Sequence, residues 1–254
     1  MRWLLATVFT VSVAVGSTAP AGAAAPVNVV FGTTWDAPSQ KLQNLVDSYL
    51  GVPGAINVTT DYIGAKLGEL DPWFWVDRSV SALMITEIAG NANNNTLGWY
   101  KEIGVKPVID GVDDGLIFAG LDGSGVSKVV TFPSGLTKFG FYMNPNGPNA
   151  ALNAPEPELF FTNRFYNDLG PTGAGAIHSP FDGDAQSLVF DVSQWKGANT
   201  WLVCFEDVDS GAPITPCCSG TDNDFNDMVF QVTALGATPN RAVTFGQLKA
   251  KYSR

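Results

Sequence analysis

Two stretches of alternating apolar residues give the clearest structural signal in this chain. Apolar side chains occupy every second position from Phe139 to Met143 and again from Trp201 to Phe205. Because successive side chains of a strand point to opposite faces, this spacing predicts strands that bury one face and expose the other. Such strands usually pair antiparallel. We therefore predict an all-β fold, a single antiparallel β-sandwich of jelly-roll-like type.

Shorter apolar runs, separated by turn residues, extend this pattern over most of the chain. Of the 254 residues, 27 are glycine and 16 are proline, which suits a fold in which every strand pair needs a turn. The predicted strands cover residues 56–60, 80–88, 97–101, 115–119, 126–132, 137–144, 158–162, 187–192, 200–206 and 225–233.

Residues 36–50 have the periodicity of a helix instead. Leu42, Val46 and Leu50 belong to an apolar stripe at helical spacing. Ser39 is the expected N-cap of this helix, and Gly51 follows it as a C-terminal stop. We predict one N-terminal helix ahead of the sandwich.

The first 25 residues resemble a secretory signal peptide. Arg2 provides the basic start, residues 3–15 form an uncharged apolar run, and residues 21–25 are small, as at a cleavage site. A retained membrane anchor is disfavoured, because the apolar run is shorter than the ~20 residues that span a bilayer. We predict a signal peptide over 1–25, a lead-in over 26–72, the sandwich over 73–236 and a tail over 237–254. The expected location is secreted, at the cell surface or periplasmic, with no membrane span after cleavage.

The overall charge narrows the choice of partners. Hydrophobic residues make up 45% of the chain and charged residues 15%, which predicts a folded domain with a sizeable core. The formal net charge is -10 and becomes -11 when Arg2 leaves with the signal peptide. An acidic surface repels nucleic acid and attracts divalent cations. We expect no nucleic-acid partner.

The main chemical feature is a group of oxygen-bearing side chains near the C-terminal end of the predicted sandwich. Its members are Glu206, Asp207, Asp222, Asp224, Asn226 and Asp227. Three of them stand at alternate positions, as in the first half of a helix–loop–helix calcium loop. That motif is not completed here, because Asp227 stands at its glycine position and Thr233 at the position of its bidentate acid. Hard oxygen ligands favour calcium, so we predict a calcium site. The alternative is a solvated turn in which these side chains cap their own backbone.

A second polar group lies earlier in the chain. It comprises Glu87, Asn91, Asn93, Asn94 and Asn95. Asparagine runs favour tight turns, so a hairpin loop is the first interpretation and a second metal or ligand loop is the alternative.

The chain has three cysteines, Cys204, Cys217 and Cys218. A disulfide is expected in an exported protein. Either Cys204 pairs with one of the other two, or Cys217 and Cys218 form a vicinal bridge, and one thiol remains in both cases.

Several segments of the chain are similar to the bacterial domain of unknown function 4114 family. They are residues 85–90, 97–100, 139–142, 201–207 and 222–230, and the resemblance covers about residues 73 to 235. The resemblance implies an exported or surface-attached bacterial protein and brings no established catalytic residues. The C-terminal sorting segment often present in such proteins is missing from this sequence.

These features favour an exported calcium-binding module with a structural or adhesion-type role. Its partner would be an extracellular polysaccharide or a cell-surface component. A carbohydrate-binding module is the alternative, with the aromatic run from Trp73 to Trp75 as its stacking platform. A glycoside hydrolase is the third hypothesis, with Glu206 and Asp227 as its carboxylate pair. We predict no enzymatic activity, because the single histidine, His178, lies in no catalytic motif.

Overall fold

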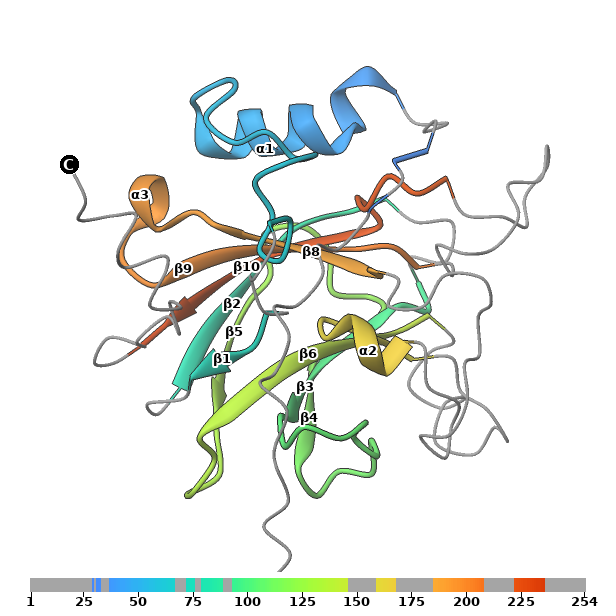
Figure 1. Cartoon of the computed structure of the whole chain (residues 1–254), viewed down its shortest axis with the longest axis vertical. Coiled ribbons are helices and arrows are strands. Elements are labelled where there is room, and N and C mark those ends of the chain that lie inside the picture. The colour runs from blue at the N-terminus through green and yellow to red at the C-terminus, as the bar shows by residue number, and fades with distance from the viewer. Residues whose placement is uncertain are drawn as a thin grey trace, which may run out of the picture.

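The computed structural model describes residues 29, 31–32, 37–66, 72–75, 79–88, 93–145, 159–167, 185–207 and 222–235. In this part of the chain, ten strands form two antiparallel sheets (Figure 1). The predicted antiparallel β-sandwich is confirmed. The predicted signal peptide over 1–25 and the predicted tail over 237–254 lie outside the described residues.

Each sheet has five strands. In sheet A the order is β1 (Phe74–Trp75), β6 (Lys138–Asn144), β3 (Thr96–Lys101) and β4 (Asp114–Phe118), and β7 (Phe160–Phe161) also pairs with β6. In sheet B the order is β5 (Ser127–Thr131), β2 (Ser79–Glu87), β10 (Met228–Ala234), β9 (Thr200–Phe205) and β8 (Ser187–Asp191). The central strand β10 therefore lies between β2 and β9, which are far apart in the sequence.

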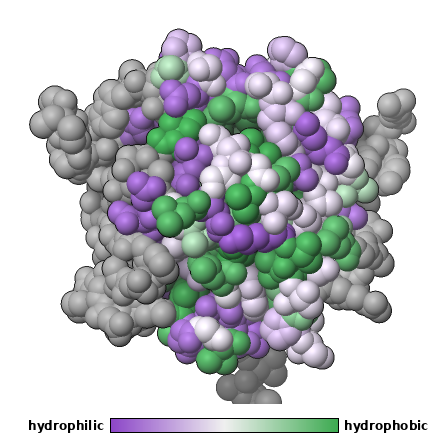
Figure 2. All heavy atoms as spheres, turned by 180° about the vertical axis from the view of Figure 1, so that it is seen from behind, coloured by the Kyte–Doolittle hydropathy of each residue, from purple (hydrophilic) through white to green (hydrophobic). Residues whose placement is uncertain are grey.

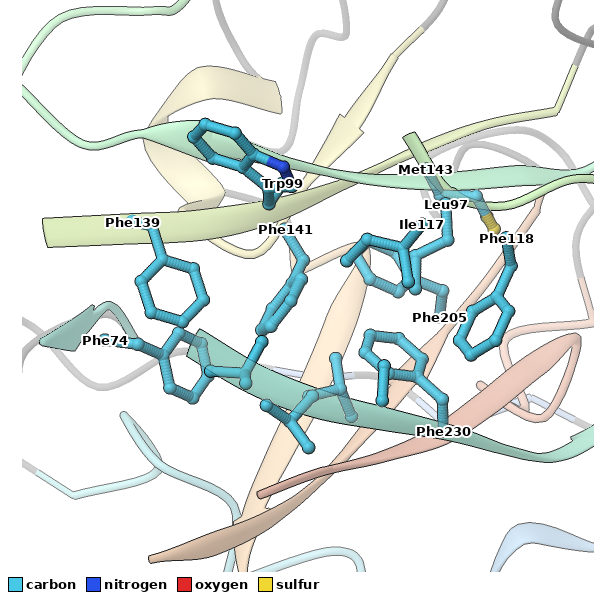
Figure 3. Packing of buried hydrophobic residues seen from close by; sticks show 14 of the residues in the cluster. Phe74, Leu97, Trp99, Ile117, Phe118, Phe139, Phe141, Met143, Phe205 and Phe230 are labelled. Carbon is cyan, nitrogen blue, oxygen red and sulfur yellow. The ribbon is translucent and has the colours of Figure 1, made fainter. Parts of the chain in front are cut away.

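The inner faces of the two sheets form an aromatic core (Figure 3). Phe139 and Phe141 point inward from β6, and Phe205 and Phe230 point inward from β9 and β10. The rings of Phe141 and Phe230 meet edge to face across the sandwich, with their centroids 5.3 Å apart. The alternating pattern seen in the sequence is thus the pattern of side chains that enter this core.

The outer face of sheet B is covered by helix α1 (Leu42–Leu50). Leu42, Val46 and Leu50 pack with apolar side chains of β8, β9 and β10, as the helical stripe predicts. The helix ends at Gly51, whose φ of 74° is the left-handed conformation that glycine adopts without strain. Two short helices, α2 (Arg164–Asn167) and α3 (Ser193–Lys196), complete the described elements.

The predicted start of this helix, at residue 36 with Ser39 as its N-cap, is wrong. Residues Pro38–Gln40 form the 3-10 helix η1, and Ser39 lies inside it. Lys41 is the N-cap of α1, with a ψ of 137° that interrupts the helical path. Proline suits the first turn of a helix, which explains why η1 begins at Pro38.

One predicted strand, over residues 56–60, is also wrong. Ile56 and Val58 are buried against α1, which accounts for their alternating pattern. The backbone around them forms turns, because Asp61 accepts a hydrogen bond from the Asn57 N–H and Asn57 accepts one from the Thr59 N–H. Such local side-chain bonds compete with strand pairing.

The outer face of sheet A carries a smaller cluster built on Tyr100, Tyr142, Phe161 and Tyr166. The face of the molecule seen from behind shows hydrophobic residues in separate groups among hydrophilic ones (Figure 2). The largest apolar exposures include Val108 and Val112, in the connection between β3 and β4.

Candidate metal centre

The pairing of β9 with β10 creates the candidate site at one end of sheet B. Phe205 lies opposite Met228 in this register. Glu206 follows Phe205 and continues the ladder, since its N–H donates to the Gln186 carbonyl oxygen (3.1 Å). Asp227 precedes Met228, so the two acids lie next to each other just beyond the strand ends. The predicted acidic motif is therefore assembled by strand pairing.

Three carboxylates converge there, and we call Glu206, Asp224 and Asp227 the outer site. One oxygen from each lies within 4.8 Å of the other two. Oxygens at this separation can all reach a single calcium ion at its usual distance of about 2.3–2.6 Å. Their exposed fractions are 1%, 6% and 9%, so these acids are not fanned out into water as the solvated-turn alternative requires. The local capping of that alternative is present, because Asp224 Oδ1 accepts a hydrogen bond from the Asn226 N–H (3.2 Å).

The loop before β10 is held in a strained shape that turns it toward Glu206. Asn223 and Phe225 have positive φ values of 52° and 57°, which is unusual for a bulky residue such as phenylalanine. The Phe225 ring is buried and packs edge to face on Phe31, with centroids 5.7 Å apart. In this shape the N–H groups of Asp224 and Phe225 donate to Glu206 Oε2 at 3.2 and 3.3 Å.

Asn226, a predicted ligand, holds Asp224 in place. Its Nδ2 donates to Asp224 Oδ2 (2.7 Å) and to the Gln40 carbonyl oxygen (2.9 Å). A second contact joins the lead-in to the loop, because the Gly32 N–H donates to the Asn223 carbonyl oxygen (3.1 Å). The segment before the sandwich therefore packs directly on the candidate site.

Asp227 shows the electrostatic cost of this arrangement. Burial, followed by the charges of Glu206 and Asp207, raises the pKa of the Asp227 carboxyl well above its ordinary value. The backbone N–H of Asp207, which donates to Asp227 Oδ2 (2.8 Å), opposes that shift. No cationic side chain is among the groups that shift this pKa in the described part of the chain. A bound cation would favour the charged form of Asp227.

The other predicted ligands occupy different places. Asp222 is partly exposed and is not among the three converging acids. Asp207 is buried and accepts a hydrogen bond at Oδ2 from Asn95 Nδ2 (3.1 Å), at the start of β3 in the opposite sheet. Glu87, at the end of β2, lies close enough for the charge of Asp207 to affect it: burial first and this charge second raise the pKa of Glu87 to about 7.

The contact of Glu87 and Asn95 with the acidic motif was not predicted. The sequence indicated only that a polar loop follows the strand ending near Glu87. Nothing in that pattern specifies that β2 pairs with β10, which brings Glu87 to the acidic motif, or that sheet A packs on sheet B so that Asn95 reaches Asp207.

The cysteines lie partly within the described residues. Cys204 lies in β9, and its free thiol is fully buried in the cluster that β9 forms with α1. The predicted pairing of Cys204 with Cys217 or Cys218 is therefore not observed. Burial raises the pKa of this thiol well above its ordinary value, which makes it unreactive. Cys217 and Cys218 lie outside the described residues, and a bridge between them stays a prediction.

The residues of the alternative hypotheses are placed only in part. Phe74 is buried in the core, and the Trp73 ring lies beneath Lys138 Nζ, 4.2 Å from the ring centroid. Glu206 and Asp227, the proposed hydrolase pair, are both buried. Their burial together with Asp224 suits a cation ligand better than a general acid that must meet a sugar. His178 lies outside the described residues.

No protein-family model, curated protein or solved structure matches this chain. Among the described residues, no helix has the length and apolar character needed to cross a membrane.

Proposed function

We propose that this chain is an exported β-sandwich module in which calcium, bound at the outer site, has a structural role. The observation that carries the proposal is the convergence of Glu206, Asp224 and Asp227 within 4.8 Å in a buried position. Like charges held this close repel one another by on the order of 1–4 kcal/mol per pair. A divalent cation removes this repulsion and converts it into attraction.

Calcium is the metal that fits this set of ligands best. All three side chains offer carboxylate oxygens, and the buried thiol of Cys204 is not one of the converging groups. Oxygen ligands favour calcium or magnesium over zinc and copper. Calcium accepts irregular coordination more readily than magnesium and is abundant outside cells.

The bound ion would link three separate segments of the chain. Glu206 follows β9, Asp227 precedes β10, and Asp224 is held by Asn226, which also bonds to Gln40 of the lead-in. Binding of a ligand to the folded state alone adds directly to the free energy of unfolding. Such calcium-dependent rigidity suits a structural or adhesion-type module that works outside the cell.

The experiment is a measurement of bound calcium. The mature chain is treated with a chelator, dialysed against calcium at a known free concentration, and analysed for calcium per protein. We expect calcium binding in the natural chain and its loss from the outer site in the Asp224→Asn variant. Asp113→Asn is the control, because Asp113 is an exposed partner of Lys101 (3.0 Å) away from the site. Absence of calcium from the natural chain would remove the proposal.

The remaining parts of the proposal rest on the sequence. Export follows from the predicted signal peptide and from the resemblance to the domain of unknown function 4114 family. A polysaccharide or cell-surface partner stays a prediction, as does the carbohydrate-binding alternative. Loss of glycan binding in a Trp73→Ala variant would support that alternative.

A further inference from the structure

Sheet B carries acidic or amide groups on both of its faces at the same end. Cys204 packs on the outer side of the sheet with α1, whereas Phe205 points into the core between the sheets. Alternation continues past the strand, so Glu206 lies on the outer side and Asp207 on the inner side. Asp207, one residue after Glu206 of the outer site, thus faces inward.

Two more polar side chains point to the same inner end. Glu87 is paired with Met228, and Met228 with Phe205. Directly opposite residues of an antiparallel pair share a face, so Glu87 lies on the inner face with these two core residues. From sheet A, Asn95 stands two residues before the core residue Leu97 and reaches Asp207 with its Nδ2 (3.1 Å). We call Glu87, Asn95 and Asp207 the inner site.

The inner site contains buried acceptor atoms that lack a donor. Asn95 is 0% exposed, and its Oδ1 has no hydrogen-bond partner. Glu87 Oε1 is also buried without a partner, although the Asn95 side chain hydrogen-bonds to the Glu87 carboxylate and opposes the rise of its pKa. Buried polar atoms in folded proteins are nearly always satisfied, by protein, by water or by an ion. A group that satisfies either oxygen has to be a cation or a hydrogen-bond donor, because an amide oxygen and a carboxylate oxygen are both acceptors.

We propose that Glu87, Asn95 and Asp207 bind a second divalent cation, which joins the start of β3 in sheet A to the ends of β2 and β9 in sheet B. The inference extends the proposed calcium binding and rests on it for the choice of calcium. One ion at the outer site would hold β9, β10 and the lead-in together. The inner ion would instead close the end of the sandwich across both sheets.

The number of buried charges supports two ions over one. The two sites contain five carboxylates, those of Glu87, Glu206, Asp207, Asp224 and Asp227. One divalent ion offsets two of these charges and leaves three, whereas two ions leave one. The backbone bond from Asp207 to Asp227 (2.8 Å) joins the sites, so charge left on one is felt by the other.

The competing explanation is a proton on Glu87. Burial and Asp207 raise the pKa of Glu87 to about 7, so a protonated Glu87 can donate a hydrogen bond near neutral pH. A calcium titration at about pH 8 separates the two cases, because there the proton is lost and only a cation keeps the site occupied.

The test is the number of calcium ions bound per chain at about pH 8, measured by isothermal titration calorimetry on chelator-treated protein. The variants are Glu87→Gln for the inner site and Glu206→Gln for the outer site. Glu102→Gln is the matched control, because Glu102 accepts a hydrogen bond from Tyr166 on the outer face of sheet A (2.5 Å). We expect two ions in the natural chain, two in the control and one in each site variant.

Other results distinguish the inner site from the outer site. A single ion that is lost in Glu206→Gln and kept in Glu87→Gln overturns the inner site and leaves the proposed function. A single ion that is lost only in Glu87→Gln supports the inner site and removes the outer one. No bound ion in the natural chain removes both.

A second variant covers the case in which Glu87→Gln does not fold. Asn95→Asp exchanges a neutral amide oxygen for a carboxylate of the same shape at the inner site. We expect it to bind one of the two ions roughly tenfold more tightly, with a smaller gain for the other ion because the two sites are joined. Unchanged affinity for both ions would overturn the inner site.

Discussion

Glu206 carries two functions in the same side chain. It accepts hydrogen bonds from the backbone N–H groups of Asp224 and Phe225, and it contributes a buried charge beside Asp227. An amide in its place can still accept the backbone bonds, whereas its charge is removed. The Glu206→Gln substitution therefore separates the structural part of the residue from the metal-binding part.

For Glu206→Gln we predict stability changes of opposite sign with and without calcium. In chelator the variant should be more stable than the natural chain by about 1–4 kcal/mol for each repulsive pair that is relieved, and Glu206 forms such pairs with Asp224 and Asp227. In saturating calcium it should be less stable, because a ligand charge is missing. Urea unfolding followed by fluorescence measures both values. A variant that is less stable under both conditions would mean that Glu206 is only a backbone acceptor.

The calcium-free protein should lose stability as the pH rises from about 4.5 to 7. The pKa of Glu87 is raised from 4.5 to about 7, so between these values the folded state binds more protons than the unfolded state. Stability then falls with increasing pH, and the raised pKa of Asp227 acts in the same direction. Saturating calcium replaces the protons and should abolish the decline. Denaturant midpoints at several pH values, with chelator and with calcium, measure this, and a flat profile in chelator would contradict it.

For single residues, the sequence predicts which side chains can bind a cation better than it predicts which of them are in contact. Asp224 and Asp227 stand in one short acidic segment, so their proximity follows from local sequence. The contact between Asp207 and Asn95 depends on the packing of one sheet on the other. The role of Asn226 as a support for Asp224 depends on the backbone at Gln40, far away in the chain. Such long-range contacts leave no periodic signal.

Among the elements, α1 and the lead-in couple the outer face of sheet B to the candidate site. Leu42 is buried against sheet B, two residues after Gln40, whose carbonyl oxygen accepts the Asn226 bond. A change that loosens the packing of α1 on sheet B should therefore also shift the loop that contains Asn226.

We predict that Leu42→Ala lowers the free energy of unfolding by about 2–5 kcal/mol, the usual range for a buried leucine. It should also weaken calcium binding, because the support of Asn226 becomes looser. Ser48→Ala is the control, since Ser48 is exposed on the same helix. Calcium titration and urea unfolding of the three proteins check this. Calcium affinity unchanged in Leu42→Ala would show that the lead-in does not support the site.

Two glycines in sheet A allow tyrosine rings to lie flat on the strands. A Cβ at Gly98 would stand 2.2 Å from Cζ of Tyr142, and a Cβ at Gly140 would stand 2.3 Å from the hydroxyl oxygen of Tyr100. We expect Gly98→Ala to cost about 1–3 kcal/mol, the typical cost of overpacking, and to leave calcium binding intact. Gly123→Ala is the control, because its Cβ would meet nothing within 4 Å. Equal stability of the two variants in urea unfolding would contradict this packing.

The elements that the sequence predicts well are long enough for their inward apolar positions to repeat, although β6 and β9 are buried on both faces and not on one as predicted. β6 and β9 have three inward positions each and match their predicted ranges closely. β1 has only two residues, too few to show a period of two. The run at 56–60 shows the opposite error, because burial under α1 imitates the alternation of a strand.

At the scale of the whole molecule, two apolar layers meet at one polar end. The inner core lies between the sheets, and the outer cluster lies between sheet B and α1. Figure 1 shows α1 over sheet B, on the side away from sheet A. The outer site borders the outer cluster, and the inner site borders the core. Cations at this end would stabilise both layers at the point where β9 and β10 leave the sheet.

The dependence of the melting temperature on free calcium reports on the ion at the outer site. At calcium about 100-fold above the dissociation constant, one site adds about 2.7 kcal/mol to the free energy of unfolding. For a chain of this size that corresponds to a rise of roughly 5–10 °C. We predict such a rise in the natural chain and its reversal by chelator. Superimposable melting curves in saturating calcium and in chelator would mean that the buried carboxylates beside β9 and β10 do not bind calcium.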